Sequence, residues 1–137
     1  MDLLRAHGID PAGKRVTVVG RSLVIGRPAA LLLTRADATV TLCHRKTPDL
    51  AARCRAADIL LAAAGAPGLI TPECVRPGQI VLDAGATALP DGTLRGDVTP
   101  AAAAIAACTP VPGGIGSVTT ALLLRHTVQA AENLRHF

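Results

Sequence analysis

The fold of this chain is decided by one stretch, Val16-Thr17-Val18-Val19-Gly20-Arg21-Ser22-Leu23-Val24-Ile25-Gly26-Arg27-Pro28. It begins with a short run of β-branched residues, passes through a loop between two glycines, and continues into a sequence typical of a helix. A strand, a loop and a helix in this order form a common phosphate-binding unit, because a helix N-terminus offers N–H groups and the positive end of its dipole. We therefore expect the rest of the chain to be a sheet built beside this unit.

Elsewhere in the chain, short apolar runs alternate with helix-like segments. We expect helices over 2–8, 28–35, 48–56, 99–107 and 117–133, a helical turn over 71–75, strands over 15–19, 38–43, 58–64 and 79–83, and a hairpin around the turn at 90–93. Strands that alternate with helices on short connections predict a parallel sheet with right-handed crossovers. The expected fold class is α/β, a Rossmann-like, doubly wound sheet in three α/β/α layers. Residues 1–137 are expected to form one domain, with a lead-in helix and turn over 1–13.

The composition disfavours several classes of partner. Of the 137 residues, half are hydrophobic and one is aromatic, and 14 Lys and Arg against 10 Asp and Glu give a net charge of +4. A chain without an aromatic stacking surface or a dense basic run is not expected to bind nucleic acid. The sequence also lacks an apolar run of membrane-spanning length and an N-terminal signal segment. We therefore expect no membrane partner and a cytoplasmic location.

The four cysteines give no indication of a metal site. They stand far apart in the sequence, at Cys43, Cys54, Cys74 and Cys108. Zinc sites favour close pairs of cysteine or histidine, and disulfide frameworks are typical of small secreted chains. We expect reduced, buried thiols and no metal.

The loop between Gly20 and Gly26 differs from the two common phosphate-binding patterns. Ser22 stands where GxGxxG has its second glycine, and Arg27-Pro28 replaces the Lys-Ser/Thr of GxxxxGK[ST] at a spacing that is one residue longer. A nucleoside triphosphatase is therefore disfavoured. A phosphate loop in a dinucleotide-binding unit remains, and the alternative of a tight turn without a ligand stays open at this point.

The loop after the second expected strand bears on the choice of ligand. In this fold a carboxylate here binds the ribose 2′-hydroxyl of NAD, whereas an arginine accommodates the 2′-phosphate of NADP. The sequence has His44-Arg45-Lys46-Thr47 and no carboxylate, and Arg21 adds a guanidinium in the first loop. A guanidinium binds a phosphate through two parallel hydrogen bonds. The pattern favours NADP, with a solvated basic turn as the alternative.

A series of short motifs runs in one order along nearly the whole chain. The motifs are Gly20-Arg21-Ser22, Gly26-Arg27-Pro28, Cys43-His44-Arg45-Lys46-Thr47, Gly65-Ala66-Pro67-Gly68, Asp83-Ala84-Gly85, Gly96-Asp97-Val98 and Pro110-Val111-Pro112-Gly113-Gly114-Ile115-Gly116. This series resembles the NADP-binding domain of the bifunctional methylenetetrahydrofolate dehydrogenase/methenyltetrahydrofolate cyclohydrolase family. Enzymes of that family interconvert 5,10-methylene-, 5,10-methenyl- and 10-formyltetrahydrofolate. They pass a hydride to the nicotinamide and then add water across the methenyl bridge.

The resemblance implies roles for particular residues. It places Gly20, Arg21 and Ser22, with Gly26 in the same loop, at the pyrophosphate and 2′-phosphate of NADP. It implies that Arg45 faces the 2′-phosphate and that Ala86 and Thr87 lie at the nicotinamide-ribose end. It implies that the cleft beside cofactor and folate is lined by Pro112, Gly113, Gly114, Gly116 and Thr119.

The sequence also departs from the family. The family carries its catalytic lysine, with a tyrosine and a glutamine nearby, in a separate N-terminal domain that binds folate. This sequence has no Tyr, and its lysines are Lys14 and Lys46. We assign no catalytic residue, and expect the chain to bind NADP and to turn over folate poorly without a complementary domain. Two alternatives stay open, a stand-alone NADP-binding or interaction module and one half of a split enzyme, and the resemblance also suggests a homodimer.

Overall fold

Strand β1 (Arg15–Val19) pairs on both sides with parallel strands in the computed structural model, which describes residues 1–134. The five-stranded sheet has the order β2-β1-β3-β4-β7. Its other strands are β2 (Thr39–Cys43), β3 (Ile59–Ala62), β4 (Ile80–Asp83) and β7 (Ala107–Cys108), each parallel to its neighbours. The predicted parallel sheet is confirmed.

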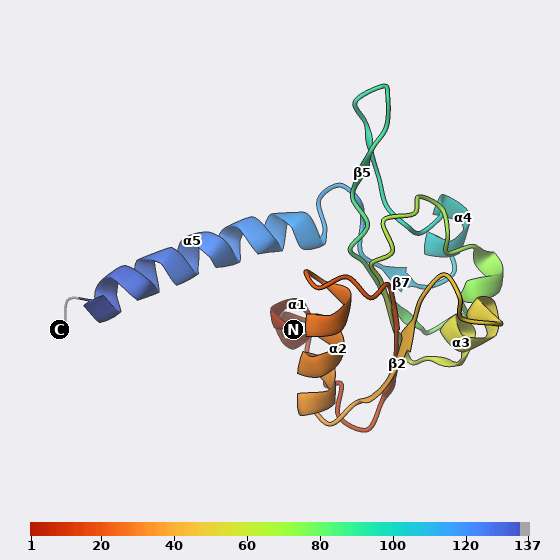
Figure 1. Ribbon diagram of the computed structural model, residues 1–137, viewed down its shortest axis with the longest axis horizontal. Helices are drawn as coiled ribbons and strands as arrows, with labels where there is room; N and C mark the ends of the chain where they lie inside the picture. The colour runs from red at the N-terminus through yellow and green to blue at the C-terminus, as the bar shows by residue number, and fades with distance from the viewer. Residues whose placement is uncertain (135–137) are drawn as a thin grey trace.

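Helices cover both faces of this sheet (Figure 1). Helices α1 (Asp2–Ala6) and α2 (Gly26–Arg35) lie on one face, and α3 (Leu50–Ala56), the 3₁₀ turn η1 (Pro72–Cys74) and α4 (Pro100–Ala103) lie on the other. Each face has its own core, one containing Leu4, Val18 and Leu33 and the other containing Cys54, Leu60 and Ala102. Strands buried on both faces are what a doubly wound sheet requires. The expected Rossmann-like α/β fold is confirmed.

The chain reverses its winding direction at β1. It crosses from β1 through α2 to β2 on one side, and returns through α3 to β3 on the other side of β1. The connections that follow β1 and β3 therefore leave toward opposite faces, and a crevice forms at the carboxyl ends of these strands. Ligands of open α/β sheets bind at such a crevice, so this edge of the sheet is where a site is expected.

The predicted helix over 99–107 is wrong beyond its first turn. Helix α4 ends at Ala103, and Ala107 and Cys108 instead form the edge strand β7. The N–H of Ala107 donates to the carbonyl of Gln79 at 3.0 Å. Pairing with β4 thus outweighs the high helix propensity of alanine, which is a weak preference compared with tertiary contacts.

Other predicted elements are present with shifted boundaries. The helix expected over 48–56 begins at Leu50, because Asp49 adopts a left-handed conformation with φ of 52° immediately before it. The expected hairpin consists of β5 (Thr87–Ala88) and β6 (Leu94–Arg95), which pair antiparallel. The helix expected over 117–133 spans Ile115–Leu134 and is called α5.

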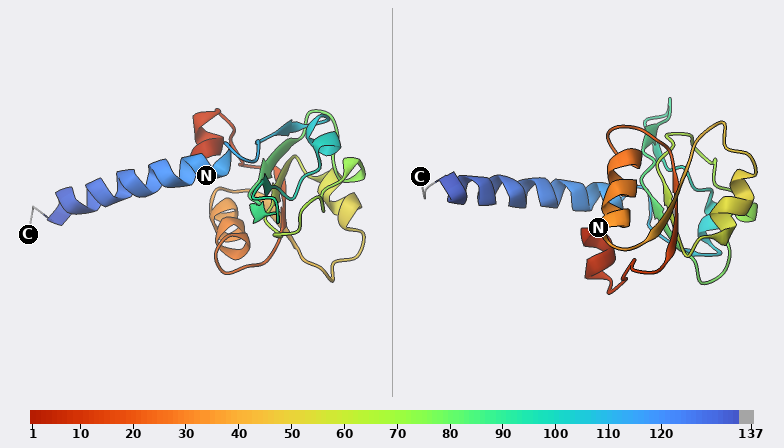
Figure 2. Two further views of the ribbon diagram at one scale, coloured as in Figure 1. Left: turned by 90° about the horizontal axis from the view of Figure 1, so that it is seen from above. Right: turned by 60° about the horizontal axis from the view of Figure 1, so that its bottom comes forward.

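Helix α5 runs away from the body of the domain (Figures 1 and 2). None of its 20 residues is buried, and Leu123, Leu124 and Val128 are each more than half exposed. Only its first turns face α1 and α2, across a small apolar cavity lined in part by Val118 and Leu122. Within residues 1–134, no helix is long and apolar enough to cross a membrane.

Candidate dinucleotide-binding site

The loop after β1 is shaped by two glycines that lie against backbone atoms. Gly20 has a φ of +121°, and a β-carbon on it would overlap the carbonyl of Ala63, just past the end of β3. Gly26 is buried at the first position of α2, and a β-carbon on it would overlap the carbonyl of Gly20. A larger side chain at either position would push the loop out of place. The two glycines thus allow the loop to fold back on itself at the crevice.

Ser22 closes this loop by binding the start of α2. Its hydroxyl oxygen accepts hydrogen bonds from the N–H groups of Ile25 (3.1 Å) and Gly26 (3.4 Å). Its carbonyl oxygen accepts a hydrogen bond from the N–H group of Arg27 (3.0 Å). The expectation that the helix start offers free N–H groups is therefore wrong, since the loop already uses these donors. In the loop itself, the backbone N–H groups of residues 21–24 have no hydrogen-bond acceptor within residues 1–134.

Two arginines follow neighbouring strands at the same edge of the sheet. Val19 of β1 is paired with Cys43 of β2, and the N–H of Gly20 donates to the Cys43 carbonyl at 2.9 Å. Arg21 and Arg45 therefore lie in adjoining loops, and both are exposed. Neither forms an ion pair with a residue in 1–134. Both guanidinium groups are thus available to an anionic ligand.

The basic loop that carries Arg45 is held by its own hydrogen bonds. The N–H of His44 donates to the hydroxyl of Thr47 at 2.9 Å, and the N–H of Lys46 donates to Nδ1 of His44 at 3.2 Å. Thr47, whose N–H donates to the His44 carbonyl at 2.8 Å, closes the turn from its other end. His44 and Thr47 thus organise the turn, and the Arg45 side chain between them stays exposed.

A cavity of about 720 Å³ opens at the carboxyl end of β4, beside the loop after β1. Its walls come from the loop after β1, the loop after β4 and the segment that leads into α5. Most residues for which the sequence implied a place near the nicotinamide and folate line it, namely Ala86, Pro112, Gly113, Gly114, Gly116 and Thr119. The structure therefore brings together segments that are far apart in the sequence into one cleft next to the glycine loop.

Six predicted site residues do not line this cavity, namely Gly20, Arg21, Ser22, Gly26, Arg45 and Thr87. Thr87 is half-buried and pairs with Arg95 in the hairpin, and Gly26 is buried under its own loop. Conversely, Val24 and Ile25 line the cavity, although neither was predicted to be a site residue. Val24 is 83% exposed. Val24 and Ile25 could have been identified from the sequence as apolar residues in a loop between two glycines, because exposed apolar surface often contacts a ligand or a partner protein.

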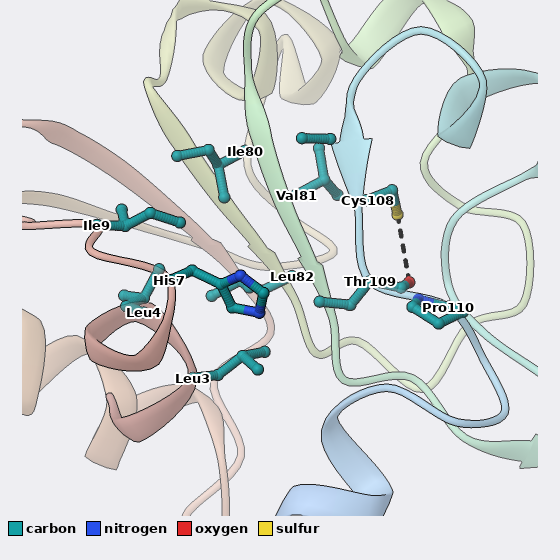
Figure 3. Close-up of a pocket in the computed structure, with 11 residues that line it drawn as sticks. Leu3, Leu4, His7, Ile9, Ile80, Val81, Leu82, Cys108, Thr109 and Pro110 are labelled. Atoms are coloured by element: carbon teal, nitrogen blue, oxygen red, sulfur yellow. Dashed lines mark hydrogen bonds between the residues drawn. The ribbon is translucent and has the colours of Figure 1, made fainter.

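A second cavity, of about 440 Å³, lies between α1 and the edge of the sheet (Figure 3). Apolar side chains such as Leu3, Ile80 and Leu82 line it together with His7 and Cys108. Burial, with a smaller contribution from the charge of Asp83, raises the pKa of the Cys108 thiol to about 11. A thiol that stays protonated is a poor nucleophile. This cavity therefore offers apolar surface rather than reactive groups.

An open parallel sheet, a glycine loop at its switch point and a cleft at the carboxyl ends of its strands define a dinucleotide-binding domain of the doubly wound class. The family described as tetrahydrofolate dehydrogenase/cyclohydrolase, NAD(P)-binding domain, has a model that matches residues 1–135. The chain belongs to this family. The resemblance noted from its motifs and the prediction of an NAD(P)-binding domain are thereby confirmed.

Individual relatives agree with this assignment. The chain is 59% identical over 131 residues to the bifunctional protein FolD 1 of Rhodococcus jostii, covering 94% of this chain and 44% of that protein. The solved structure of the bifunctional enzyme FolD from Campylobacter jejuni, a methylenetetrahydrofolate dehydrogenase/cyclohydrolase, matches 97% of this chain and 48% of its own at 43% identity, with a TM-score of 0.92. The Trypanosoma brucei enzyme, solved with NADP cofactor and an inhibitor, matches 93% of this chain and 46% of its own at 46% identity, with a TM-score of 0.85. The chain thus spans about half the length of the relatives it matches.

Proposed function

We propose that this chain is the NADP-holding part of a methylenetetrahydrofolate dehydrogenase/methenyltetrahydrofolate cyclohydrolase, completed by a domain that binds the folate. The observation that carries this proposal is the pair of exposed guanidinium groups, Arg21 and Arg45, in adjoining loops beside the unpaired amides of 21–24. Backbone N–H groups suit a pyrophosphate, and a guanidinium suits a phosphate monoester. The loop over 44–47 has no carboxylate for a free 2′-hydroxyl, which favours NADP over NAD.

The proposed roles follow the edge of the sheet. Gly20 lets the backbone approach the pyrophosphate, Gly26 and the Ser22 hydroxyl hold the loop in shape, and the Arg21 and Ser22 amides donate to phosphate oxygens. Arg21 and Arg45 bind the 2′-phosphate, and Ala86 and Thr87 meet the nicotinamide-ribose end. The folate lies against Pro112, Gly113, Gly114, Gly116 and Thr119. When bound, NADP supplies the acceptor for a hydride.

Replacing Arg21 or Arg45 by Ala tests the 2′-phosphate assignment. Each change should weaken NADP binding by about tenfold, the effect of losing a hydrogen bond between charged groups, and should leave NAD binding within about twofold. Calorimetric titration with both cofactors measures this. Arg35→Ala, exposed in the last turn of α2, is the matched control and should leave both affinities unchanged. Equal losses for NADP and NAD would contradict the assignment.

The cleft itself offers little acid–base chemistry for the folate. Asp83 is the one residue with a titratable side chain among the described residues that line it. Its two oxygens already accept backbone N–H groups of Gly85, Asp97 and Val98. General acid–base catalysis requires a group that reaches the reacting atoms and exchanges a proton. We therefore infer that the chain alone binds cofactor and turns over folate poorly.

Mixing the chain with 5,10-methylenetetrahydrofolate and NADP, and following the absorbance of reduced cofactor, tests this inference. Little reduction is expected from the chain alone, and more when the N-terminal half of a bifunctional relative is added. Rapid turnover by the chain alone would contradict it. Intact NADP binding without rescue would instead favour a stand-alone NADP-binding or interaction module.

Helix α5 supports completion by a further domain or chain. Helices in proteins owe most of their stability to tertiary packing, and α5 has 20 residues and no buried side chain. Leu123, Leu124 and Val128 give it apolar surface. An added domain that carries the folate site would cover this surface and close the cleft at the start of α5.

We also propose a homodimer and a cytoplasmic location. The β5–β6 hairpin extends from the body (Figure 1), and a two-stranded hairpin is marginally stable alone, so pairing with a second copy would support it. Sedimentation should therefore give a dimer, and a monomer at all concentrations would contradict this.

The proposed cytoplasmic location is supported by the free, buried thiols of Cys43, Cys54 and Cys74, because the cytoplasm keeps thiols reduced.

A further inference from the structure

Two acidic side chains are buried next to the cleft. Asp83, the last residue of β4, is 4% exposed, and Asp97 is fully buried. A buried charge is costly unless hydrogen bonds compensate it. Each of these carboxylates accepts three backbone N–H groups, and each reaches a loop at the carboxyl edge of the sheet.

Asp97 holds the loop that follows β3. Its Oδ2 accepts the N–H groups of Ala64 (2.6 Å) and Gly65 (3.0 Å), and its Oδ1 accepts that of Ala66 (2.8 Å). This loop begins at Ala63, whose carbonyl lies against Gly20 of the phosphate loop. The Asp97 carboxylate thus fixes three successive amides directly beside the place proposed for the pyrophosphate.

Asp83 holds the loop that follows β4 and also holds Asp97. Its Oδ1 accepts the N–H groups of Gly85 (2.9 Å) and of Asp97 itself (3.0 Å), and its Oδ2 accepts that of Val98 (3.0 Å). Gly85 directly precedes Ala86 in the cleft wall. The two carboxylates therefore act in series: Asp83 sets the backbone around Asp97, and Asp97 sets the loop after β3.

Two glycines make room for these carboxylates. A β-carbon on Gly96 would overlap the carboxylate of Asp83, and one on Gly85 would lie 2.6 Å from that of Asp97. The motifs Asp83-Ala84-Gly85 and Gly96-Asp97-Val98 are therefore two halves of one contact, in which each glycine accommodates the aspartate of the other motif.

We infer that Asp83 and Asp97 are positioning residues that preset the loops after β3 and β4 for the dinucleotide, with Asp83 acting on the nicotinamide end through Gly85 and Ala86. This rests on the orientation of NADP given under the proposed function. Preset backbone groups lower the ordering cost of binding. Loss of either carboxylate would therefore reduce affinity for the cofactor in addition to reducing stability.

Gln79 provides a matched control for a purely structural role. It is also fully buried and also makes three hydrogen bonds to backbone groups, those of Cys54, Ala57 and Arg76. It directly precedes β4, at the end opposite Asp83 and away from the cleft. Gln79→Met should lower stability without changing cofactor affinity.

The test compares Asp83→Asn, Asp97→Asn and Gln79→Met by calorimetric titration well below their melting temperatures. The NH2 group of asparagine cannot accept an N–H, so each Asn variant loses at least one of the three backbone hydrogen bonds of the carboxylate. Both Asn variants should bind NADP about tenfold more weakly, and Gln79→Met should bind it within about twofold of wild type. Asp83→Asn should lose more affinity for NADP than for 2′,5′-ADP, which lacks the nicotinamide end held through Gly85 and Ala86. NADP affinity unchanged in the Asn variants, or equal losses for NADP and 2′,5′-ADP in Asp83→Asn, would overturn the inference.

Hydrogen exchange of the wild-type chain gives a readout that does not depend on the variants folding. The amides of Ala64, Gly65 and Ala66 should be protected by at least about tenfold relative to those of Leu23 and Val24 before any NADP is added. Protection that appears only with NADP would overturn the presetting role. If wild type fails to bind NADP, the proposed function fails, whereas the exchange pattern still reports whether the carboxylates hold the loop.

Discussion

Replacing Gly26 by Ala tests the geometry of the phosphate loop, because two effects of opposite sign compete there. Alanine is the better helix former, and at the first residue of α2 the exchange gains at most about 1 kcal/mol. Against this gain, the new β-carbon would overlap the carbonyl of Gly20 and lie 3.0 Å from Cα of Arg21. These are backbone atoms of a loop anchored at Cys43 and at Ser22. The loop must therefore move as a whole.

The steric cost should exceed the gain in helix propensity. Inserting a methyl group into a packed site costs about 1–3 kcal/mol, and the rigid backbone neighbours of Gly26 place it at the upper end. A net loss of about 2 kcal/mol remains, which for a domain of this size lowers Tm by about 8 °C. The displaced loop also carries the amides of 21–24, so NADP binding should weaken by more than about tenfold.

Urea unfolding and calorimetric titration measure the two effects. Gly116→Ala is the matched control for stability, because Gly116 is the second residue of α5 and a β-carbon on it meets no atom within 4 Å. That variant should be as stable as wild type or slightly more stable. A Gly26→Ala protein that unfolds at the wild-type urea concentration and binds NADP with wild-type affinity would refute the account of the loop.

Three further predictions concern regions outside the site. The Arg15 side chain hydrogen-bonds Asp58 and lowers the pKa of the Asp58 carboxyl from 3.8 to about 2. The ionised Asp58 therefore stabilises the folded protein by about 1 kcal/mol after allowance for solvent exposure. This stabilisation is complete above about pH 4 and is lost as the pH falls through 2. Urea unfolding at several pH values should show a flatter acid limb for Asp58→Asn, and an unchanged limb would contradict this. Leu60→Ala in the core should cost about 3 kcal/mol, whereas the same change at exposed Leu31 should cost under about 0.5 kcal/mol. Burial, with smaller contributions from neighbouring thiols, raises the pKa of Cys54 to about 12, so a thiol reagent should label it in urea and not in the folded protein.

The parts of the fold that sequence predicts are those that depend on local pattern. Strand β1 was expected over 15–19 and spans Arg15–Val19. A continuous run of β-branched residues is typical of a strand that is buried on both faces of a parallel sheet. The first helix was expected over 2–8 and spans Asp2–Ala6, with Gly8 at a φ of +66° just past its end. Such features are decided by residues that are neighbours in the chain.

The parts that sequence could not predict depend on contacts across the fold. Strand β7 exists because Ala107 and Cys108 lie beside β4, and nothing local marks them as a strand. The hydrogen bonds of Asp97 join it to Ala64, 33 residues earlier. Ser22 was expected to contact phosphate, and only the folded loop reveals that its hydroxyl is already used by Ile25 and Gly26. Local sequence therefore predicts which residues form the site, whereas the hydrogen bonds that hold its loops are visible only in the structure.

Calorimetric titration of the unmodified chain with NADP and, separately, with NAD tests whether this domain binds NADP through its 2′-phosphate. We predict saturable binding of one NADP per chain and an affinity for NAD that is lower by at least about tenfold, since NAD lacks the phosphate that Arg21 and Arg45 are proposed to bind. Equal affinity for the two cofactors, or no binding of NADP, would contradict it.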